Sequence, residues 1–256
     1  MTRLPTGKRY RFGATAFQIA LEANGRDRAP YPLSYRRERV DHLDDDLRSR
    51  EQAARRLQAG YDEILHAVFG VLLEPQARVE IAGTHGQQRQ EVRVFAGISG
   101  PSAVLAVQEP GPTPEHGGDI VLTTHPATTI AADIIAALPR STPGSTPRFD
   151  GRRSDLTAPV YARHPTQLSP VEQVQRFFHR PRAGSGEITA YPGYQLDSRP
   201  TGDGCGFFWL DYPDGRYVLT NHDADNFTVI PGDIETLMRR LSDNINACTR
   251  PQEFPW

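Results

Sequence analysis

The segment FFWLDYPDGRYVLT, residues 207–220, has two strand-forming runs on either side of a tight turn. Pro213 and Gly215 frame the turn, because proline presets one backbone angle and glycine accepts a positive one. An earlier segment, residues 92–108, repeats this arrangement around Gly100. The two hairpins predict a fold built largely from antiparallel strands.

Each hairpin lies within a longer series of four candidate strands. The first series covers residues 79–81, 92–94, 102–108 and 119–123, and the second covers residues 187–191, 207–211, 216–220 and 227–230. A helix with regularly spaced apolar residues follows each series, after Pro126 in the first and after Pro231 in the second. The order helix, four strands, helix therefore occurs twice, although the two halves share little sequence identity.

This repeated order predicts an α+β fold with a pseudo-twofold repeat, in which a central, largely antiparallel β-sheet carries helical groups packed on it. We expect one domain over residues 1–256, with an N-terminal half at about 9–139 and a C-terminal half at about 168–248. Residues 140–167 are rich in Pro, Ser, Thr and Gly, which predicts a long, mobile connector. Two separate small domains joined by that connector are the alternative.

The ends of the helices carry their own signals. Thr15 and Gln18 are spaced as a capping box, and Ser169 precedes a proline at a strong helix start. Apolar residues at helical spacing over residues 57–68 predict a single amphipathic helix. The last helix is predicted to start after Asp233.

The side chains of two strands indicate whether each face of the sheet is exposed to water or covered. Arg78 and Glu80 alternate with apolar residues, which predicts that one face of the sheet is in water. The aromatic strand places Phe207 and Trp209 on one face and Phe208 on the other. This fits a central strand covered on both sides, and it also fits a strand with one face held for a partner.

Charge and composition argue against several classes of protein. The chain has 29 Lys and Arg against 31 Asp and Glu, for a net charge of −2, whereas dedicated nucleic-acid-binding domains are usually basic. Its two cysteines exclude a disulfide scaffold or a cysteine-based zinc cluster. It has no run of about 18 apolar residues and no secretory pattern at its start, so we expect a cytoplasmic protein without membrane insertion.

Motifs for catalysis or cofactor binding are weak. The glycine-rich residues 202–206 lead into a strand, whereas a phosphate-binding loop leads into a helix. Residues 222–226 lack the glycine and the terminal glutamate of a calcium loop. We therefore expect no cofactor, no metal and no enzymatic activity.

Several segments resemble the sheet of the EspG family, the secretion-associated adaptors of actinobacterial ESX (type VII) systems. The resembling segments are residues 77–83, 92–97, 103–108, 208–217 and 228–231. The opening strand and helix, residues 12–21, also look like that family's. The resemblance extends over about residues 9–245.

The resemblance implies a cytosolic chaperone that binds the apolar tip of the PPE protein in a PE–PPE heterodimer, keeps it soluble and directs it to an ESX secretion system. It implies client contacts from the sheet, from the loop at residues 84–90 and from the C-terminal helix at residues 233–247. The expected partner-binding residues are His85, Gln87, Arg89, Leu237, Met238, Arg240 and Leu241. An adaptor for a different secreted helical pair, or an enzyme with a site at residues 202–206, is the alternative.

Overall fold

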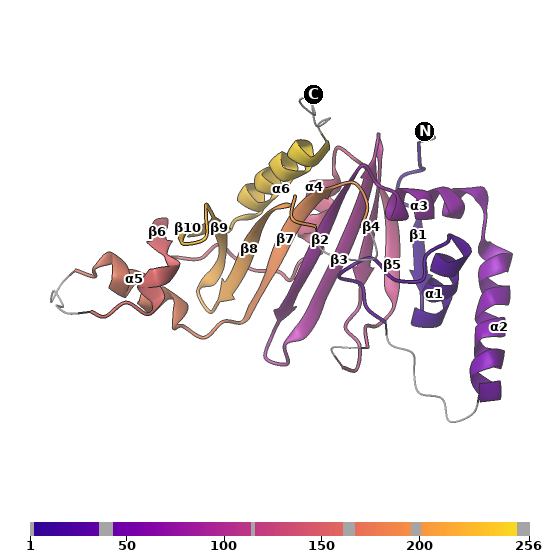
Figure 1. Cartoon of the computed structure of the whole chain (residues 1–256), viewed down its shortest axis with the longest axis horizontal. Helices are drawn as coiled ribbons and strands as arrows, with labels where there is room; N and C mark the ends of the chain where they lie inside the picture. Colours follow the sequence, from indigo (N-terminus) through magenta and orange to yellow (C-terminus); the bar gives the residue numbers. More distant parts are fainter. Residues whose placement is uncertain (1–2, 36–42, 114–115, 161–166, 196–200, 250–256) are drawn as a thin grey trace.

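A computed structural model describes residues 3–35, 43–113, 116–160, 167–195 and 201–249 (Figure 1). The first half contains β1 (Arg9–Phe12), α1 (Ala14–Ala23), α2 (Leu43–Gly60), α3 (Glu63–Leu73), β2 (Ala77–His85), β3 (Gln90–Ser99), β4 (Ser102–Gln108), β5 (Ile120–Pro126) and α4 (Ile130–Ala136). The second half contains β6 (Phe149–Arg152), the short 3-10 helix η1 (Arg153–Leu156), α5 (Pro170–Phe178), β7 (Gly184–Pro192), β8 (Cys205–Tyr212), β9 (Gly215–Asn221), β10 (Asn226–Pro231) and α6 (Ile234–Thr249). None of the helices in these described parts is long and apolar enough to cross a membrane.

All ten strands belong to one antiparallel sheet with the order β1-β5-β4-β3-β2-β7-β8-β9-β10-β6. The halves meet where β2 pairs with β7, and Ile81 faces Ile188 at the middle of that pair. Moving outward from this pair, β3 corresponds to β8, β4 to β9, β5 to β10 and β1 to β6. The predicted α+β fold and its pseudo-twofold strand order are confirmed.

The two hairpin turns match in place but not residue by residue. Gly100 lies inside the first turn, between the paired Ser99 and Ser102, and has φ 55°. Gly215 instead starts β9, pairs with Tyr212 and has φ 127°. Both turns require a residue with positive φ, and glycine adopts such a φ without the strain that other residues would incur.

Asp214 ties the second turn to its surroundings. Its carboxylate accepts hydrogen bonds from the Tyr217 hydroxyl and from Ser145 Oγ at 2.8 Å, and it pairs with Arg180 at 3.1 Å. Burial alone would raise the pKa of Asp214, but these hydrogen bonds and the arginine hold the pKa at about 2. The turn is therefore fixed to the connector and to the segment after α5.

One face of the sheet is covered by α4 and α6. Their apolar side chains pack with those of β2, β3, β4, β7, β8 and β9 in a single core cluster. Trp209 is fully buried there, and its indole lies across Gly83 and Gly186, where any Cβ would overlap the ring. These two glycines are adjacent to Trp209 across three neighbouring strands, so their small size creates the space for it.

The opposite face carries two separate clusters. At one end of the sheet α1 and α3 pack on β1, β3, β4 and β5, and at the other end α5 packs on β6, β8, β9 and β10. Figure 1 shows α1, α2 and α3 together at one end of the molecule and α5 at the other. The middle of this face lies between the two helical groups.

Helix starts follow the predicted caps in two of three places. Ser169 Oγ accepts a hydrogen bond from the Glu172 amide at 3.2 Å in a capping box, and Asp233 caps α6. The capping box predicted at Thr15 is wrong. The chain is extended at Gly13 and already helical at Ala14, so Thr15 lies within the helix.

Two predictions about continuity need correction. Residues 57–68 do not form one helix, because α2 ends at Gly60 and Asp62 starts α3 by accepting the Leu65 amide hydrogen bond at 2.7 Å. The mobility predicted for the connector at 140–167 is wrong at Phe149–Arg152, because β6 pairs there with β10 at the edge of the sheet. Residues 161–166 of that connector lie outside the described residues.

Candidate functional site

The middle of the sheet carries a face that the helices leave open. On β2 and β7 the side chains facing away from α4 and α6 are Arg78, Glu80, Ala82, Glu187, Thr189 and Tyr191, which we call the central sheet face. Neither flanking cluster includes a residue of β2 or β7. Glu187 is exposed, and its cross-strand neighbour Phe208 is half-buried. Arg78, Glu80 and Thr189 are buried, so the accessible part of this face is Ala82, Glu187 and Tyr191, and that part is a candidate binding surface.

A buried ion pair lies at one end of this face. Arg78 Nε donates to Glu80 Oε1 at 2.6 Å, and the side chains of both residues are almost fully buried. The water-exposed face predicted from their alternation with apolar residues is therefore wrong at this position. Burial raises the pKa of Glu80, and the hydrogen bonds from Arg78 and Gln195 oppose that rise.

The remaining donors of Arg78 hold the β7–β8 connection. Its Nη1 donates to the carbonyls of Pro192 and Gly193 at 3.0 and 3.1 Å, and its Nη2 donates to Thr201 Oγ1 at 3.0 Å. The guanidinium also lies 4.5 Å from the centre of the Tyr191 ring. A buried guanidinium with all of these partners positions the connection beside the central sheet face.

Gln195 joins segments from the two halves above the ion pair. Its Nε2 donates to Glu80 Oε1 at 2.5 Å, and its Oε1 accepts the Tyr31 amide hydrogen bond at 2.9 Å. The side chain of Tyr31 is 45% exposed. Burial, followed by the nearby charges of Glu187 and Glu80, raises the pKa of Tyr31. Tyr31 therefore stands at the border of the central sheet face, next to its carboxylates.

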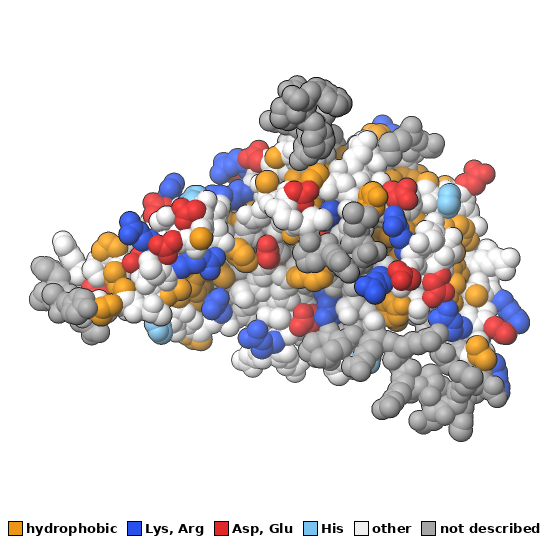
Figure 2. All heavy atoms as spheres, viewed as in Figure 1, with side chains coloured by type: hydrophobic (Ala, Val, Ile, Leu, Met, Phe, Trp, Pro, Cys, Tyr) orange, Lys and Arg blue, Asp and Glu red, His pale blue; other side chains and the backbone are white. Residues whose placement is uncertain are grey.

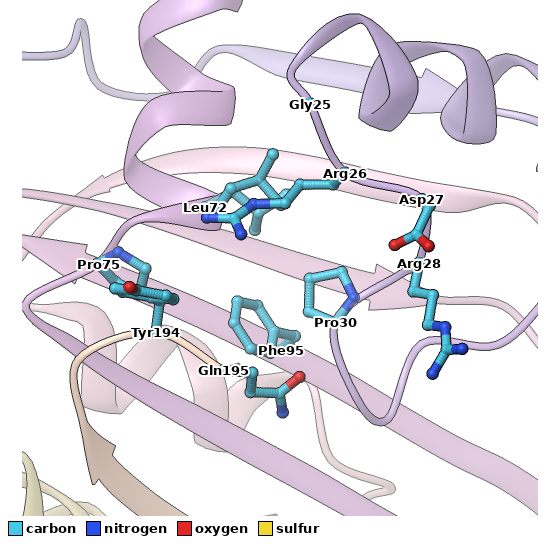
Figure 3. A pocket seen from close by; sticks show the side chains of 11 residues that line it. Gly25, Arg26, Asp27, Arg28, Pro30, Leu72, Pro75, Phe95, Tyr194 and Gln195 are labelled. Carbon is cyan, nitrogen blue, oxygen red and sulfur yellow. The ribbon is translucent and has the colours of Figure 1, made fainter. Parts of the chain in front are cut away.

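A small pocket of about 160 Å³ opens next to this bridge (Figure 3). Its walls come from the segment after α1, the end of α3, strand β3 and the β7–β8 connection. It is lined by Gly25, Arg26, Asp27, Arg28, Pro30, Leu72, Leu73, Pro75, Phe95, Tyr194 and Gln195. The Arg26 guanidinium lies 5.4 Å from the centre of the Tyr194 ring, so an aromatic side chain and a cation stand together at the rim.

The surface around these features is mixed in charge. Figure 2 shows acidic and basic side chains distributed over the visible face, with hydrophobic side chains in small separate groups. Large exposed apolar residues in the described parts include Tyr194, which lines the pocket, and Tyr31, whose amide bonds the lining residue Gln195. The site therefore offers isolated aromatic contacts inside a polar surround.

The predicted loop residues lie at the tip of the β2–β3 hairpin. Gln87 and Arg89 are exposed, and Arg89 has φ 50° within the turn. His85 is half-buried, and its Nδ1 is 3.7 Å from Asp211 Oδ2 without a hydrogen-bond partner. The loop is accessible, and its contact with a partner stays a prediction.

The predicted residues of the last helix are placed differently. Leu237 and Leu241 are 1% and 0% exposed, because the apolar stripe of α6 packs on the sheet. The expectation that these two leucines offer an apolar surface to a client therefore needs correction. Met238 packs on the same core, and Arg240 is half-buried with Nη1 donating to Thr220 Oγ1 at 2.9 Å. The large apolar residue that α6 exposes is Ile234, at 65%.

The motifs considered for chemistry have structural explanations. Gly204 and Gly206 lie against Tyr191 and Thr189, where a Cβ would overlap their side chains. His222 Nε2 bonds Thr228 Oγ1 at 2.7 Å in the turn between β9 and β10. Across the part of the chain that the structure describes, no group of three His, Cys, Asp or Glu residues is arranged to hold a metal ion.

Sequence reasoning missed the central sheet face as a unit. Its members come from β2 and β7, and Tyr31 and Gln195, which are 164 positions apart, meet beside it. One local signal was present, since Arg78 and Glu80 are opposite charges two positions apart on one strand and so share a face. Their pairing with Gln195 has no signal in the sequence.

Comparison with known proteins agrees with this architecture. The model of the EspG family matches residues 14–243. Among solved structures, the chain is similar to the type VII secretion system chaperone EspG5 of Mycobacterium tuberculosis, determined in complex with a PE25-PPE41 dimer. The TM-score is 0.57 at 13% identity, and the match covers 96% of this chain and 99% of that chain. At this identity the likeness establishes the shared fold. No curated protein matches this chain.

Proposed function

This chain belongs to the EspG family, and on that premise we propose that it is a specific chaperone for a PE–PPE heterodimer. It binds the apolar tip of the PPE protein in the cytosol, keeps the pair soluble and directs it to an ESX (type VII) secretion system. It acts by binding alone and converts no substrate. The observation that carries the proposal is the family match over residues 14–243, supported by a fold shared with a chaperone that was determined together with a PE–PPE dimer.

The client's tip docks on the central sheet face and the adjoining β2–β3 loop. A surface that shields an apolar segment needs apolar contacts inside a polar rim. Phe208 supplies half-buried aromatic area and Tyr31 supplies exposed aromatic area. Glu187 supplies a charge directly opposite Phe208 and near Tyr31. The apolar stripe of α6 does not contribute, because it is used inside the molecule.

The decisive experiment is co-expression of the full chain with PE–PPE pairs encoded in the same genome. We expect one pair to co-elute with the chain in size-exclusion chromatography as a 1:1:1 complex. Failure of every such pair to bind would refute the proposed function.

Two matched charge reversals then test the docking surface. Glu187→Arg changes the exposed end of the central sheet face, and Glu235→Arg makes the same change on the exposed side of α6. We expect only Glu187→Arg to weaken co-elution. Arg89→Glu in the loop should have a smaller effect, since an exposed charge pair contributes about 0–1 kcal/mol. Equal retention of the client by Glu187→Arg and Glu235→Arg would place the docking surface elsewhere.

A further inference from the structure

The two cysteines of this chain meet where α6 crosses the start of β8. Cys205 is the first residue of β8 and shares its face with Phe207 and Trp209, toward α6. Cys248 lies in the last turn of α6 and packs against the same core cluster. The chain has no other cysteine.

Side-chain contacts fix this crossing. Asn244 Nδ2 donates to the carbonyl of Cys205 at 3.0 Å, and Cys248 follows Asn244 by one helical turn on the same side of the helix. The Cys205 thiol is close enough to Cys248 to contribute to the raised pKa of the Cys248 thiol. Both are free cysteines in this structure, so two reduced thiols stand at the crossing that the Asn244 contact fixes.

The two thiols differ in accessibility to solvent. Cys205 is exposed, whereas Cys248 is half-buried. Burial, together with the proximity of Cys205, raises the pKa of the Cys248 thiol to about 11. Cys248 is therefore protonated at neutral pH, and Cys205 is the sulfur that an oxidant in solution reaches first.

We propose that Cys205 and Cys248 are a redox pair that closes to an intramolecular disulfide when a peroxide oxidises the protein. The Cys205 thiolate attacks hydrogen peroxide to give a sulfenic acid and hydroxide, which takes up a proton to become water. The Cys248 sulfur then attacks the sulfenic sulfur, its thiol proton leaves with the sulfenic hydroxyl as a second water, and the S–S bond forms. A dithiol reductant reverses the reaction by thiol–disulfide exchange.

The disulfide would fasten the C-terminal turn of α6 to the start of β8. Cross-linking two distant points of the chain restricts the unfolded state, so oxidation should raise the melting midpoint by about 5 °C or more. The crossing is on the α6 side of the sheet, opposite the central sheet face. The proposal is therefore independent of the proposed client binding.

The test compares the purified full chain before and after mild treatment with hydrogen peroxide. We expect the intact mass to fall by two hydrogens, titratable thiols to fall from two to none per chain, and a single cross-linked peptide to contain both cysteines. Dithiothreitol should restore the mass and the lower melting midpoint. Cys205→Ser and Cys248→Ser are matched controls, and each should retain its reduced melting midpoint and show no oxidative gain.

The outcomes separate clearly. A monomer with the cross-linked peptide and a higher melting midpoint supports the proposal. Oxygen addition to Cys205 without loss of the Cys248 thiol would overturn it, as would covalent dimers linked through Cys205. An Asn244→Ala variant should close the disulfide more slowly than the wild type, because the hydrogen bond that holds helix against strand is removed. An unchanged closing rate would show that this contact does not position the pair.

Discussion

Replacing Leu241 by alanine tests whether the apolar side of α6 is structural or held for a client. Leu241 is fully buried and lies between the helix and the centre of the sheet. Truncation removes three carbon atoms from a site whose neighbours belong to strands paired on both sides, so the cavity cannot collapse easily. The structure therefore predicts destabilisation with no direct loss of client contact.

The magnitude follows from this burial. Leucine-to-alanine changes in protein cores cost about 2–5 kcal/mol, with larger values where the surroundings do not relax. We expect about 3 kcal/mol for Leu241→Ala. A domain of this size loses about 2–4 °C per kcal/mol, so the melting midpoint should fall by about 6–12 °C.

The assay is urea unfolding followed by circular dichroism, with Ile234→Ala as the matched control on the same helix. Ile234 is 65% exposed, so its truncation should change the free energy of unfolding by less than about 0.5 kcal/mol. Folded Leu241→Ala protein should still co-elute with its PE–PPE pair. If Leu241→Ala kept wild-type stability but lost client binding, the reasoning would be refuted, and Leu241 would be a client-contact residue.

Three further changes test other parts of the structure. Gly215→Val should lower the free energy of unfolding by about 2–4 kcal/mol, because Gly215 has φ 127° and a Cβ there would lie 2.5 Å from the Pro143 carbonyl oxygen. An unchanged melting midpoint would contradict this. Arg78→Met should lower the free energy of unfolding by about 3–5 kcal/mol, because it leaves Glu80 buried without its ion-pair partner. The double variant Arg78→Met with Glu80→Leu should recover much of this loss, and urea unfolding of both variants measures it. Asp214→Asn should lower stability at neutral pH. The pKa of Asp214 is below its ordinary value in the folded state, so its contribution is present above about pH 4 and is lost as the pH falls toward about 2. The difference between wild type and Asp214→Asn in unfolding midpoints should therefore shrink below about pH 4, and a constant difference would exclude the charge as its cause.

Local patterns predicted most elements and their order. Alternation and turn chemistry located the central strands, because both depend on neighbours within a few residues. The capping box at Ser169 succeeded for the same reason. Thr15 failed because its environment is set by the extended backbone at Gly13, where β1 gives way to the helix.

The candidate site was less accessible to sequence reasoning. The β2–β3 loop, predicted at residues 84–90, was predictable, since a tip between two strands is exposed wherever the strands lie. The apolar stripe of α6 was a correct sign of a buried surface, but the stripe alone does not say whether the sheet or a client covers it. The same ambiguity affected Arg78 and Glu80, whose alternation with apolar residues is compatible with either water or a buried partner.

The sequence by itself determined the repeated order of strands and helices, the two hairpin turns and the membership in a family, because these depend on local periodicity and on residue identity. Only the tertiary structure decided that β2 pairs with β7, that Gln195 meets Tyr31 and Glu80, and that Cys205 lies beside Cys248. Such pairings bring together positions far apart in the chain. Their free energy comes from burial and hydrogen bonding that exist only after the whole sheet has assembled.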